Sequence, residues 1–386
     1  MSAKDSRGGV DRRSFLRGTA QAVGAAAVAG PLQALLARNA AGEPLRSGPG
    51  YGKLIETPDE TTGSPLLKLP RGFRYLTFGW TGDPLDDGSP TPPMHDGMAV
   101  AEAMYDRVVL VRNHELSGDG TTFAGERITY DPKGPGGTSN LVFNCETGKL
   151  EKSWASIGGT VRNCAGGPTP WGSWLTCEET VDGPGDMFGT ETVRPLALKQ
   201  THGWIFEVPA SRPAAPVPIS DMGRFVHEAV AVDPATGYVY ETEDKATSGF
   251  YRFIPRQYGL LHLGGKLQML KATGREDLRK GLEVGEVFKV QWVDIQDPTL
   301  AHSPEAKDGL GVFSQGRRQG GAIFDRLEGG WHHSGLIYFI STSGGDAGAG
   351  QVWEYNPRRE QLRLIFESPN REVLDHPDNM TVSPRG

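Results

Sequence analysis

A cysteine next to small residues, and several glutamates at the ends of apolar runs, are the residues best suited to chemistry. Cys164 lies in residues 163–167 (NCAGG), where two glycines indicate a loop. The glutamates are Glu115, Glu179, Glu228, Glu243 and Glu328. A carboxylate on the apolar face of a strand must be neutralised, paired or bound to a cation, because burying it bare costs several kcal/mol. The pattern therefore indicates a metal site.

The donor types indicate which cations such a site would take. Converging carboxylates raise one another's pKa values unless multivalent cations lie among them. Oxygen-rich acidic sites suit calcium, and one thiolate among oxygens suits a transition metal such as iron. For any single glutamate, a solvated strand end is the simpler interpretation. His114 and His227 each precede a glutamate and show no zinc spacing, so we expect them to be structural.

The three cysteines leave two interpretations open. Cys145, Cys164 and Cys177 are an odd number, so at most two of them can pair. One interpretation makes Cys164 a metal ligand. The other pairs Cys145 with Cys177 in a disulfide and buries Cys164 as a small apolar side chain.

The elements that must position these residues are strands. Short runs rich in Val, Ile, Phe, Tyr and Trp alternate with Gly and Pro, which number 53 and 28 across the chain. The clearest runs are residues 107–112, 203–208, 238–241, 249–254, 287–293, 336–341, 352–355 and 362–366. Hairpin turns are expected at residues 144–148, 233–237 and 356–358. Many short meanders favour an all-β, β-propeller-like fold over the alternative, a β-sandwich.

Strand alternation assigns the acidic strand ends to faces. Side chains along a strand point alternately to its two sides. In residues 240–244 (YETED), Glu241 and Glu243 therefore share one face and Asp244 takes the other. Glu228 likewise aligns with the valines of its own run.

The first residues resemble an export signal. Residues 11–17 (DRRSFLR) precede an Ala/Gly-rich run that is too interrupted for a membrane anchor. We expect residues 1–41 to be a twin-arginine signal, read by the twin-arginine translocation machinery. Residues 42–386 would then form one domain of an exported, periplasmic or extracellular monomer.

The charge balance argues against nucleic acid and anionic membranes as partners. The full chain carries −7, and its first 40 residues hold six Lys/Arg against two Asp/Glu, so the remainder carries −11. Most of this negative charge simply favours solubility. At the other end, residues 376–386 predict a strand and a turn without a return strand, so we expect a C-terminal blade to be missing.

Several motifs together resemble the PhoX-type alkaline phosphatases, a family of exported propeller proteins, over residues 72–386. They are residues 113–115 (NHE), 136–140 (GGTSN), 163–167 (NCAGG), 175–179 (LTCEE), 223–228 (GRFVHE), 240–244 (YETED), 326–328 (RLE) and 377–379 (PDN). The resemblance implies a propeller of about six blades that releases phosphate from small-molecule phosphate esters with two iron ions and calcium. The last blade would be incomplete here.

The resemblance also implies roles for individual residues. Cys164 would be an iron ligand, and the carboxylate ligands would be Glu115, Glu179, Glu228, Glu243 and Glu328. Asn140 and Arg326 would hold the substrate phosphate, for which the guanidinium fork is well shaped.

Two other functions are compatible with channel carboxylates. One is a calcium-dependent propeller esterase or lactonase, in which Arg326 would have little to bind because the ester is neutral. The other is a non-catalytic or inactive propeller. No G-x-S-x-G elbow surrounds Ser173, so no protein nucleophile is expected.

Overall fold

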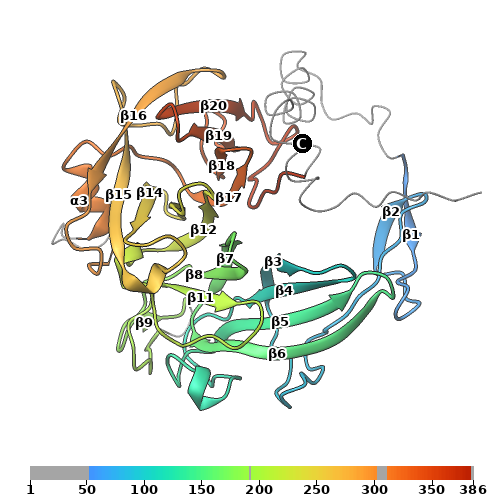
Figure 1. Ribbon diagram of the computed structural model, residues 1–386. Helices are drawn as coiled ribbons and strands as arrows, with labels where there is room; N and C mark the ends of the chain where they lie inside the picture. The colour runs from blue at the N-terminus through green and yellow to red at the C-terminus, as the bar shows by residue number, and fades with distance from the viewer. Residues whose placement is uncertain (1–51, 191–192, 302–310, 384–386) are drawn as a thin grey trace, which may run out of the picture.

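The computed structural model describes residues 52–190, 193–301 and 311–383, and these form an almost entirely β structure (Figure 1). The helical elements in this part are one short helix, α3 (Val312–Arg317), and the 3-10 turns η1 (Glu126–Ile128), η2 (Ser220–Met222) and η3 (Leu261–Leu263). The all-β prediction is confirmed. The expected signal, residues 1–41, lies outside the described residues. No described helix is long and apolar enough to span a bilayer.

Four groups of antiparallel strands follow one another along the chain, and we call them blades one to four. Blade one contains β3 (His95–Ala103), β4 (Arg107–His114), β5 (Gly136–Asn144) and β6 (Lys149–Thr160). Blade two contains β7 (Asn163–Pro168), β8 (Ser173–Glu178) and β11 (Ile205–Pro209). Blade three contains β12 (His227–Val232), β13 (Val239–Glu243), β14 (Phe250–Pro255) and β15 (Gly265–Ala272). Blade four contains β17 (Leu327–His333), β18 (Leu336–Ser341), β19 (Gln351–Asn356) and β20 (Gln361–Glu367).

The first strand of every blade lies innermost. β7 packs against both β3 and β12, and β12 packs against β17. Figure 1 shows these four strands gathered in the middle of an arc, with the later strands of each blade outside them. This arrangement is the propeller-like fold that the sequence predicted. The described residues show four blades, and the six-bladed ring stays a prediction.

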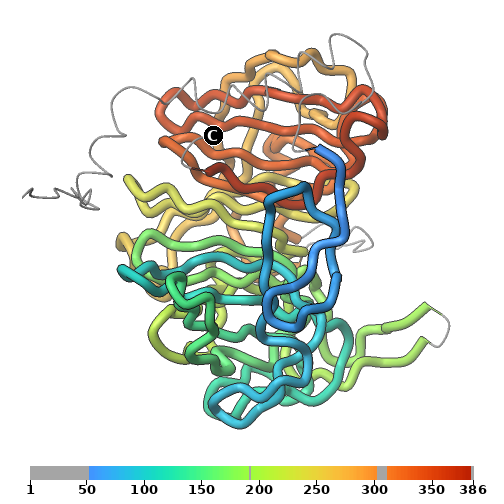
Figure 2. The backbone as a smooth tube through the Cα atoms, turned by 90° about the vertical axis from the view of Figure 1, so that its right-hand side faces the viewer, coloured from blue at the N-terminus to red at the C-terminus, as the bar shows by residue number. Residues whose placement is uncertain are grey.

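One strand, β16 (Val287–Asp294), joins blades three and four into a single nine-stranded sheet. Its residues 290–294 pair with β15, and its residues 287–289 pair with β20. Two smaller hairpins stand apart: β1 (Leu54–Thr57) with β2 (Leu67–Pro70), and β9 (Met187–Phe188) with β10 (Arg194–Pro195). Figure 2 shows the β1–β2 hairpin, in blue, in front of the stacked blades.

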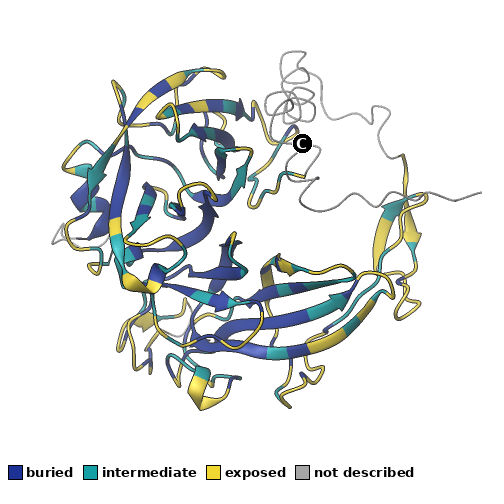
Figure 3. Ribbon diagram, viewed as in Figure 1, coloured by how far each residue is buried: buried dark blue, intermediate teal, exposed yellow. Residues whose placement is uncertain are grey.

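The apolar core fills the space between neighbouring blades. The rings of Phe250 and Phe339 stack with centroids 4.1 Å apart, which joins β14 to β18. The indole of Trp353 is fully buried against Phe324, at 5.6 Å. Figure 3 shows that the inner strands β7 and β12 are mostly buried, whereas the peripheral β1–β2 hairpin has many exposed residues. Burial of each large side chain contributes about 1.5–3 kcal/mol, so inter-blade packing fixes the inner strands in place.

The predicted hairpin turns are present. The side chain of Asn144 accepts hydrogen bonds from the N–H groups of Glu146 and Thr147, and Gly148 closes the β5–β6 turn with φ 66°. Asp233 accepts from Ala235 in the β12–β13 turn, which Gly237 closes with φ 73°. A side-chain acceptor at the start and a glycine with positive φ at the end are what these turns require.

Candidate metal centre

The four blades begin with the same backbone arrangement. In each, the residue just before the first strand accepts a hydrogen bond from the N–H of the residue just after the second strand. The donor–acceptor pairs are Glu115–Met94 (2.8 Å), Glu179–Arg162 (2.9 Å), Asp244–Val226 (3.1 Å) and Thr342–Arg326 (2.8 Å). These residues therefore occupy equivalent positions in the fold.

In each blade, the candidate ligand lies two residues after the residue that accepts this hydrogen bond. The equivalent residues are Asp96, Cys164, Glu228 and Glu328. Strand pairing slips at each of these points, between residues 95 and 98, 163 and 166, 227 and 230, and 327 and 330. A β-bulge re-aims the side chain that it contains. Simple alternation therefore does not assign faces here, which corrects the alignment expected for Glu228.

A small residue follows each candidate ligand, because the inner strands approach one another closely. The four residues are Gly97, Ala165, Ala229 and Gly329. A Cβ atom on Gly97 would lie 2.7 Å from both the Cα of Ala165 and the carbonyl oxygen of Cys164. A Cβ on Gly329 would lie 2.7 Å from the Cα of Asn379. The small residues thus let the ligand-bearing backbones meet.

The C-terminal segment supplies one more acid to the same place. Asp378 accepts a hydrogen bond from the N–H of Gly329 through its carbonyl, at 2.8 Å. His376, two residues earlier, has a left-handed φ of 47°, as do Met94, Arg162 and Arg326 in the blades, with φ between 49° and 56°. Residues 376–379 therefore run beside β17 and bring a carboxylate to the position that the other blades fill.

The side chains of these residues form two groups that could each hold a cation. The donor atoms of Cys164, Glu179 and Glu228 all lie within 4.8 Å of one another, and all three residues are buried. The donor atoms of Glu228, Glu328 and Asp378 form the second group, within the same limit. Glu228 belongs to both, so the two positions are adjacent. A thiol with carboxylates fits a transition metal, and carboxylates alone fit calcium.

Burial and mutual repulsion shift the pKa values of these acids upward. Burial raises the pKa of Glu179 to about 8, and Asp244 and Glu115 add to the rise although Arg162 opposes it. Burial and the charge of Glu228 raise the pKa of Glu328 to about 11. Burial and neighbouring carboxylates also raise the pKa values of the Glu228 carboxyl and the Cys164 thiol. The neutral, protonated forms of these acids are therefore favoured when no cation is bound.

A carboxyl pair from blade one lies at the edge of the centre. Asp96 and Glu115 share a hydrogen bond, and burial together with Glu115 raises the pKa of Asp96 to about 7. The charge of Asp378 raises the pKa of Asp96 further, because Asp96 lies near the second group of donors.

Two arginines face the acids. Arg326 donates from Nε and Nη2 to the two oxygens of Asp244, at 2.7 and 2.8 Å, and from Nη2 to Glu328 at 2.7 Å. The Nε of Arg162 lies 3.0 Å from Glu179 and 3.4 Å from Glu115. The hydrogen bonds to Asp244 raise the pKa of Arg326 further, so it stays charged.

Buried polar side chains fix the ligand backbones. The amide nitrogen of Asn113 donates to the carbonyls of Cys164 and Ala165, at 3.0 and 2.8 Å. Its oxygen accepts from Trp174 and Thr176. In blade three, the Oγ1 of Thr242 donates to the carbonyl of Glu328 at 2.7 Å. These contacts hold β7 and β17 in register with their neighbours.

The structure brings together most of the site residues expected from the sequence. The two donor groups contain Cys164, Glu179, Glu228 and Glu328. Glu115 is connected to Glu179 through Arg162, whose Nε lies near both carboxylates.

Two of the expected residues make other contacts. The Oε2 of Glu243 accepts from the N–H of Gly249 and from Tyr251, and Glu243 belongs to neither donor group. Asn140 donates to the carbonyls of Pro209 and Ala210, which places its amide nitrogen at the end of β11.

The disulfide alternative is wrong. All three cysteines are free, with Cys145 exposed and Cys164 and Cys177 buried.

Three residues near the centre were not expected: Asp96, Asp244 and Arg162. Asp244, which directly follows β13, binds Arg326, whereas Glu243 makes its contacts elsewhere. The signal that could have revealed Asp96 is the repeated acid or thiol followed by Gly or Ala, in HDG (95–97), NCA (163–165), HEA (227–229) and LEG (327–329).

The chain also matches a known protein family. A family model described as Alkaline phosphatase PhoX matches residues 50–140 and 131–386. A search of curated proteins found no match.

Proposed function

This chain belongs to the PhoX alkaline phosphatase family, and from that premise we propose that it is a metal-dependent phosphomonoesterase that acts outside the cytoplasm. The observation that supports metal dependence is the pair of donor groups sharing Glu228, in which a thiol and buried carboxylates converge. Iron is proposed for the group with Cys164, and calcium for the group of carboxylates. When bound, such cations neutralise phosphate charge and lower the pKa of water for hydrolysis.

The protein's own residues would bind and orient the ester. Arg326 is fixed by Asp244 and Glu328, so its guanidinium is already oriented when substrate arrives. These carboxylates engage its Nε and Nη2, so Nη1 is the nitrogen that would donate to a phosphate oxygen.

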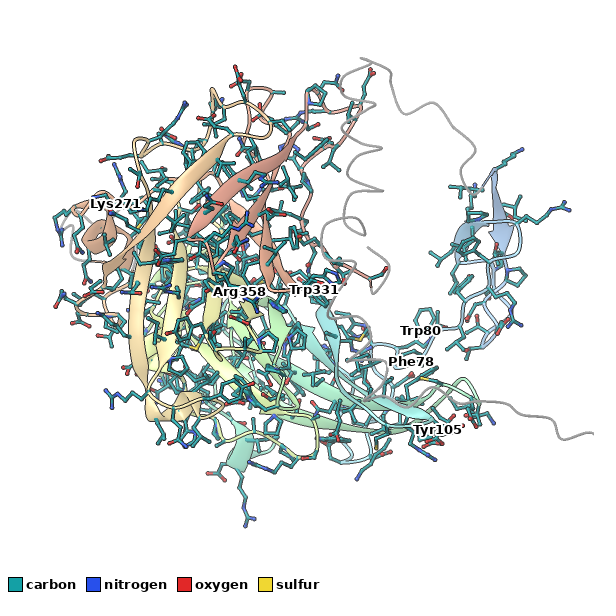
Figure 4. The ribbon with its side chains drawn as sticks, turned by 45° about the horizontal axis from the view of Figure 1, so that its top comes forward. Phe78, Trp80, Tyr105, Lys271, Trp331 and Arg358 are labelled. Atoms are coloured by element: carbon teal, nitrogen blue, oxygen red, sulfur yellow. The ribbon has the colours of Figure 1, made fainter. Side chains whose placement is uncertain are left out.

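A cavity next to the centre offers room for the organic part of the ester. It has a volume of about 850 Å³ and is lined by Met98, Trp174, Trp331 and Met380 among others. Figure 4 shows Trp331 on β17, close to β3. Gly97 and Asn379 also line this cavity, and their neighbours Asp96 and Asp378 belong to the acidic centre. An apolar wall beside a charged centre suits an ester whose leaving group is partly hydrophobic.

Export remains part of the proposal. Residues 11–17 support passage through the twin-arginine translocation machinery, and we propose a periplasmic or extracellular monomer. Mass measurement of the secreted protein tests both the cleavage and the oligomeric state.

The activity test uses the metal-loaded protein and two matched cysteine variants. Wild type should hydrolyse p-nitrophenyl phosphate at alkaline pH and lose activity in chelator. Cys164→Ala should lose bound iron and at least about 100-fold of the activity, since metal ligands matter at least as much as the groups that orient them. Cys177→Ala, which removes the other buried free thiol, should keep both.

Two outcomes would contradict the proposal. One is full activity and full iron content in Cys164→Ala. The other is hydrolysis of a lactone by wild type without hydrolysis of the phosphate ester, which would favour the calcium-dependent esterase.

A further inference from the structure

Arg162 occupies in blade two the position that Arg326 occupies in blade four. Both have left-handed backbones, with φ 56° and 49°. The N–H of Arg162 donates to Leu116, just after Glu115, and that of Arg326 donates to Lys245, just after Asp244. A non-glycine residue in this conformation costs about 1–2 kcal/mol, and these backbone bonds hold it there. The fold therefore presents two guanidinium groups to one centre from equivalent places.

The contacts of the two arginines are also equivalent. The Nε of each lies by the carboxylate that ends the second strand of the preceding blade: Glu115 for Arg162, at 3.4 Å, and Asp244 for Arg326, at 2.7 Å. Glu179 connects the two sides, because it lies 3.0 Å from Arg162 and is hydrogen-bonded to Asp244. The arginines therefore flank the Glu179–Asp244 pair.

Arg162 keeps donors available for a further anion. Within the described part of the chain, its terminal nitrogens form no hydrogen bond, and its side chain is 43% exposed. The side chains of Glu179 and Asp244 beneath are only 10% and 8% exposed. An anion that approaches Glu179 and Asp244 from solvent thus meets the arginines before it meets these two carboxylates.

We propose that Arg162 is a second phosphate-binding residue, which together with Arg326 holds the non-bridging oxygens of a phosphate monoester from two sides. This inference rests on the proposed function. A monoester carries up to two negative charges on three terminal oxygens, so the terminal nitrogens of Arg162 and the Nη1 of Arg326 can each donate to it. The simpler role of Arg162, neutralising Glu115 and Glu179, makes a different prediction because it requires no contact with substrate.

The test measures binding of inorganic phosphate to the metal-loaded protein by calorimetry, together with metal content. Arg162→Gln should weaken phosphate binding about tenfold or more, the effect of losing a charged hydrogen bond, and raise KM for p-nitrophenyl phosphate more than it lowers kcat. Arg107→Gln is the matched control. Arg107 also pairs with two carboxylates, Asp106 and Glu151, but lies on the outer part of blade one. This control should bind phosphate like wild type.

A second variant covers the case in which Arg162→Gln loses metal. Arg162→Lys keeps a positive charge beside Glu115 and Glu179 but removes the planar fork. With wild-type metal content it should bind phosphate at least about threefold more weakly, at the low end for such a bond. Wild-type phosphate affinity in a metal-replete Arg162 variant overturns the inference, whether the variant carries Gln or Lys.

The two proposals can fail separately. If wild type binds phosphate through Arg162 but hydrolyses no phosphate ester, the proposed function fails and the binding role stands. If wild type is an active phosphatase and metal-replete Arg162→Gln equals it in phosphate affinity and KM, the inference alone fails.

Discussion

The buried side chain of His202 links blade two to the β4–β5 connection of blade one. Its Nδ1 lies 2.7 Å from Glu178 and its Nε2 lies 3.4 Å from Asp131. Burial alone would lower its pKa, but the two carboxylates raise it to about 9. Glu178 also accepts from the N–H groups of Val161, Gly203 and Trp204. One glutamate next to the candidate ligand Glu179 is therefore structural.

The charge of His202 should make stability depend on pH. Because its folded pKa lies above the value in an unfolded chain, its contribution is complete below about pH 6.5 and is lost as pH rises to about 9. His202→Gln should lack up to about 3 kcal/mol of this contribution at pH 6 and differ less at pH 9.5. Urea unfolding at a series of pH values measures it. The exposed His262→Gln serves as control, and parallel curves for His202→Gln and wild type would contradict the assignment.

Some site residues could be identified from the sequence, and others could not. Cys164 could be singled out because a thiol next to small residues in a loop is unusual, and Arg326 because the family resemblance and its guanidinium fork suggest phosphate binding. Asn140 could not be judged in the same way, since its contacts come from β11, about 70 residues away. Contacts of that kind depend on tertiary packing, which a local motif does not contain.

At the scale of elements, the bulged inner strand is the unit that builds the centre. Each one carries a donor at the bulge and a small residue after it. The small residue is required because the next inner strand lies against it. The donor and the glycine or alanine therefore act as a pair.

Gly97→Ala tests this pair directly. The new Cβ would overlap backbone atoms of Cys164 and Ala165, at 2.7 Å, so the two strands must separate. We expect a loss of about 1–3 kcal/mol in the free energy of unfolding and weaker metal binding, measured by urea unfolding and by metal analysis. Gly125→Ala is the control, because a Cβ there meets no atom within 4 Å; it should change stability by less than about 0.5 kcal/mol. Equal stability of the two variants would refute the packing argument.

The sequence predicted hairpins better than sheets. Neighbouring strands and their turns are local, and the Asn and Asp residues that start the turns are visible in the sequence. The run at residues 287–293 predicted a strand, but nothing in it shows that one half pairs with β15 and the other with β20. The bulges were also missed, since they arise from contacts between blades.

At the scale of the molecule, the centre collects acids from four blades and the C-terminal segment. Asp96, Glu179 and Glu328 have pKa values of about 7, 8 and 11, all above the unfolded values near 4. Such acids stabilise the folded state fully at low pH, and the contribution is lost as pH rises through the folded pKa values.

The metal-free protein should therefore become less stable as pH rises from about 5 to 9. Melting temperature in chelator should fall across this range, and added calcium should restore it most at alkaline pH because cations bind the ionised ligands. Glu328→Gln cannot ionise at this position, so its melting temperature in chelator should fall less than that of wild type. A melting temperature that rises with pH in chelator would show that these acids do not converge.

The nine-stranded sheet affects how blades three and four unfold. Because β16 is hydrogen-bonded to β15 along one half and to β20 along the other, the backbone network is continuous from β12 to β17. If either blade unfolded locally, β16 would lose hydrogen bonds on that side. We therefore expect blades three and four to unfold as one cooperative unit. Glu228 and Glu328 lie on β12 and β17, the two edge strands of this unit, so we expect loss of the unit to displace both ligands together.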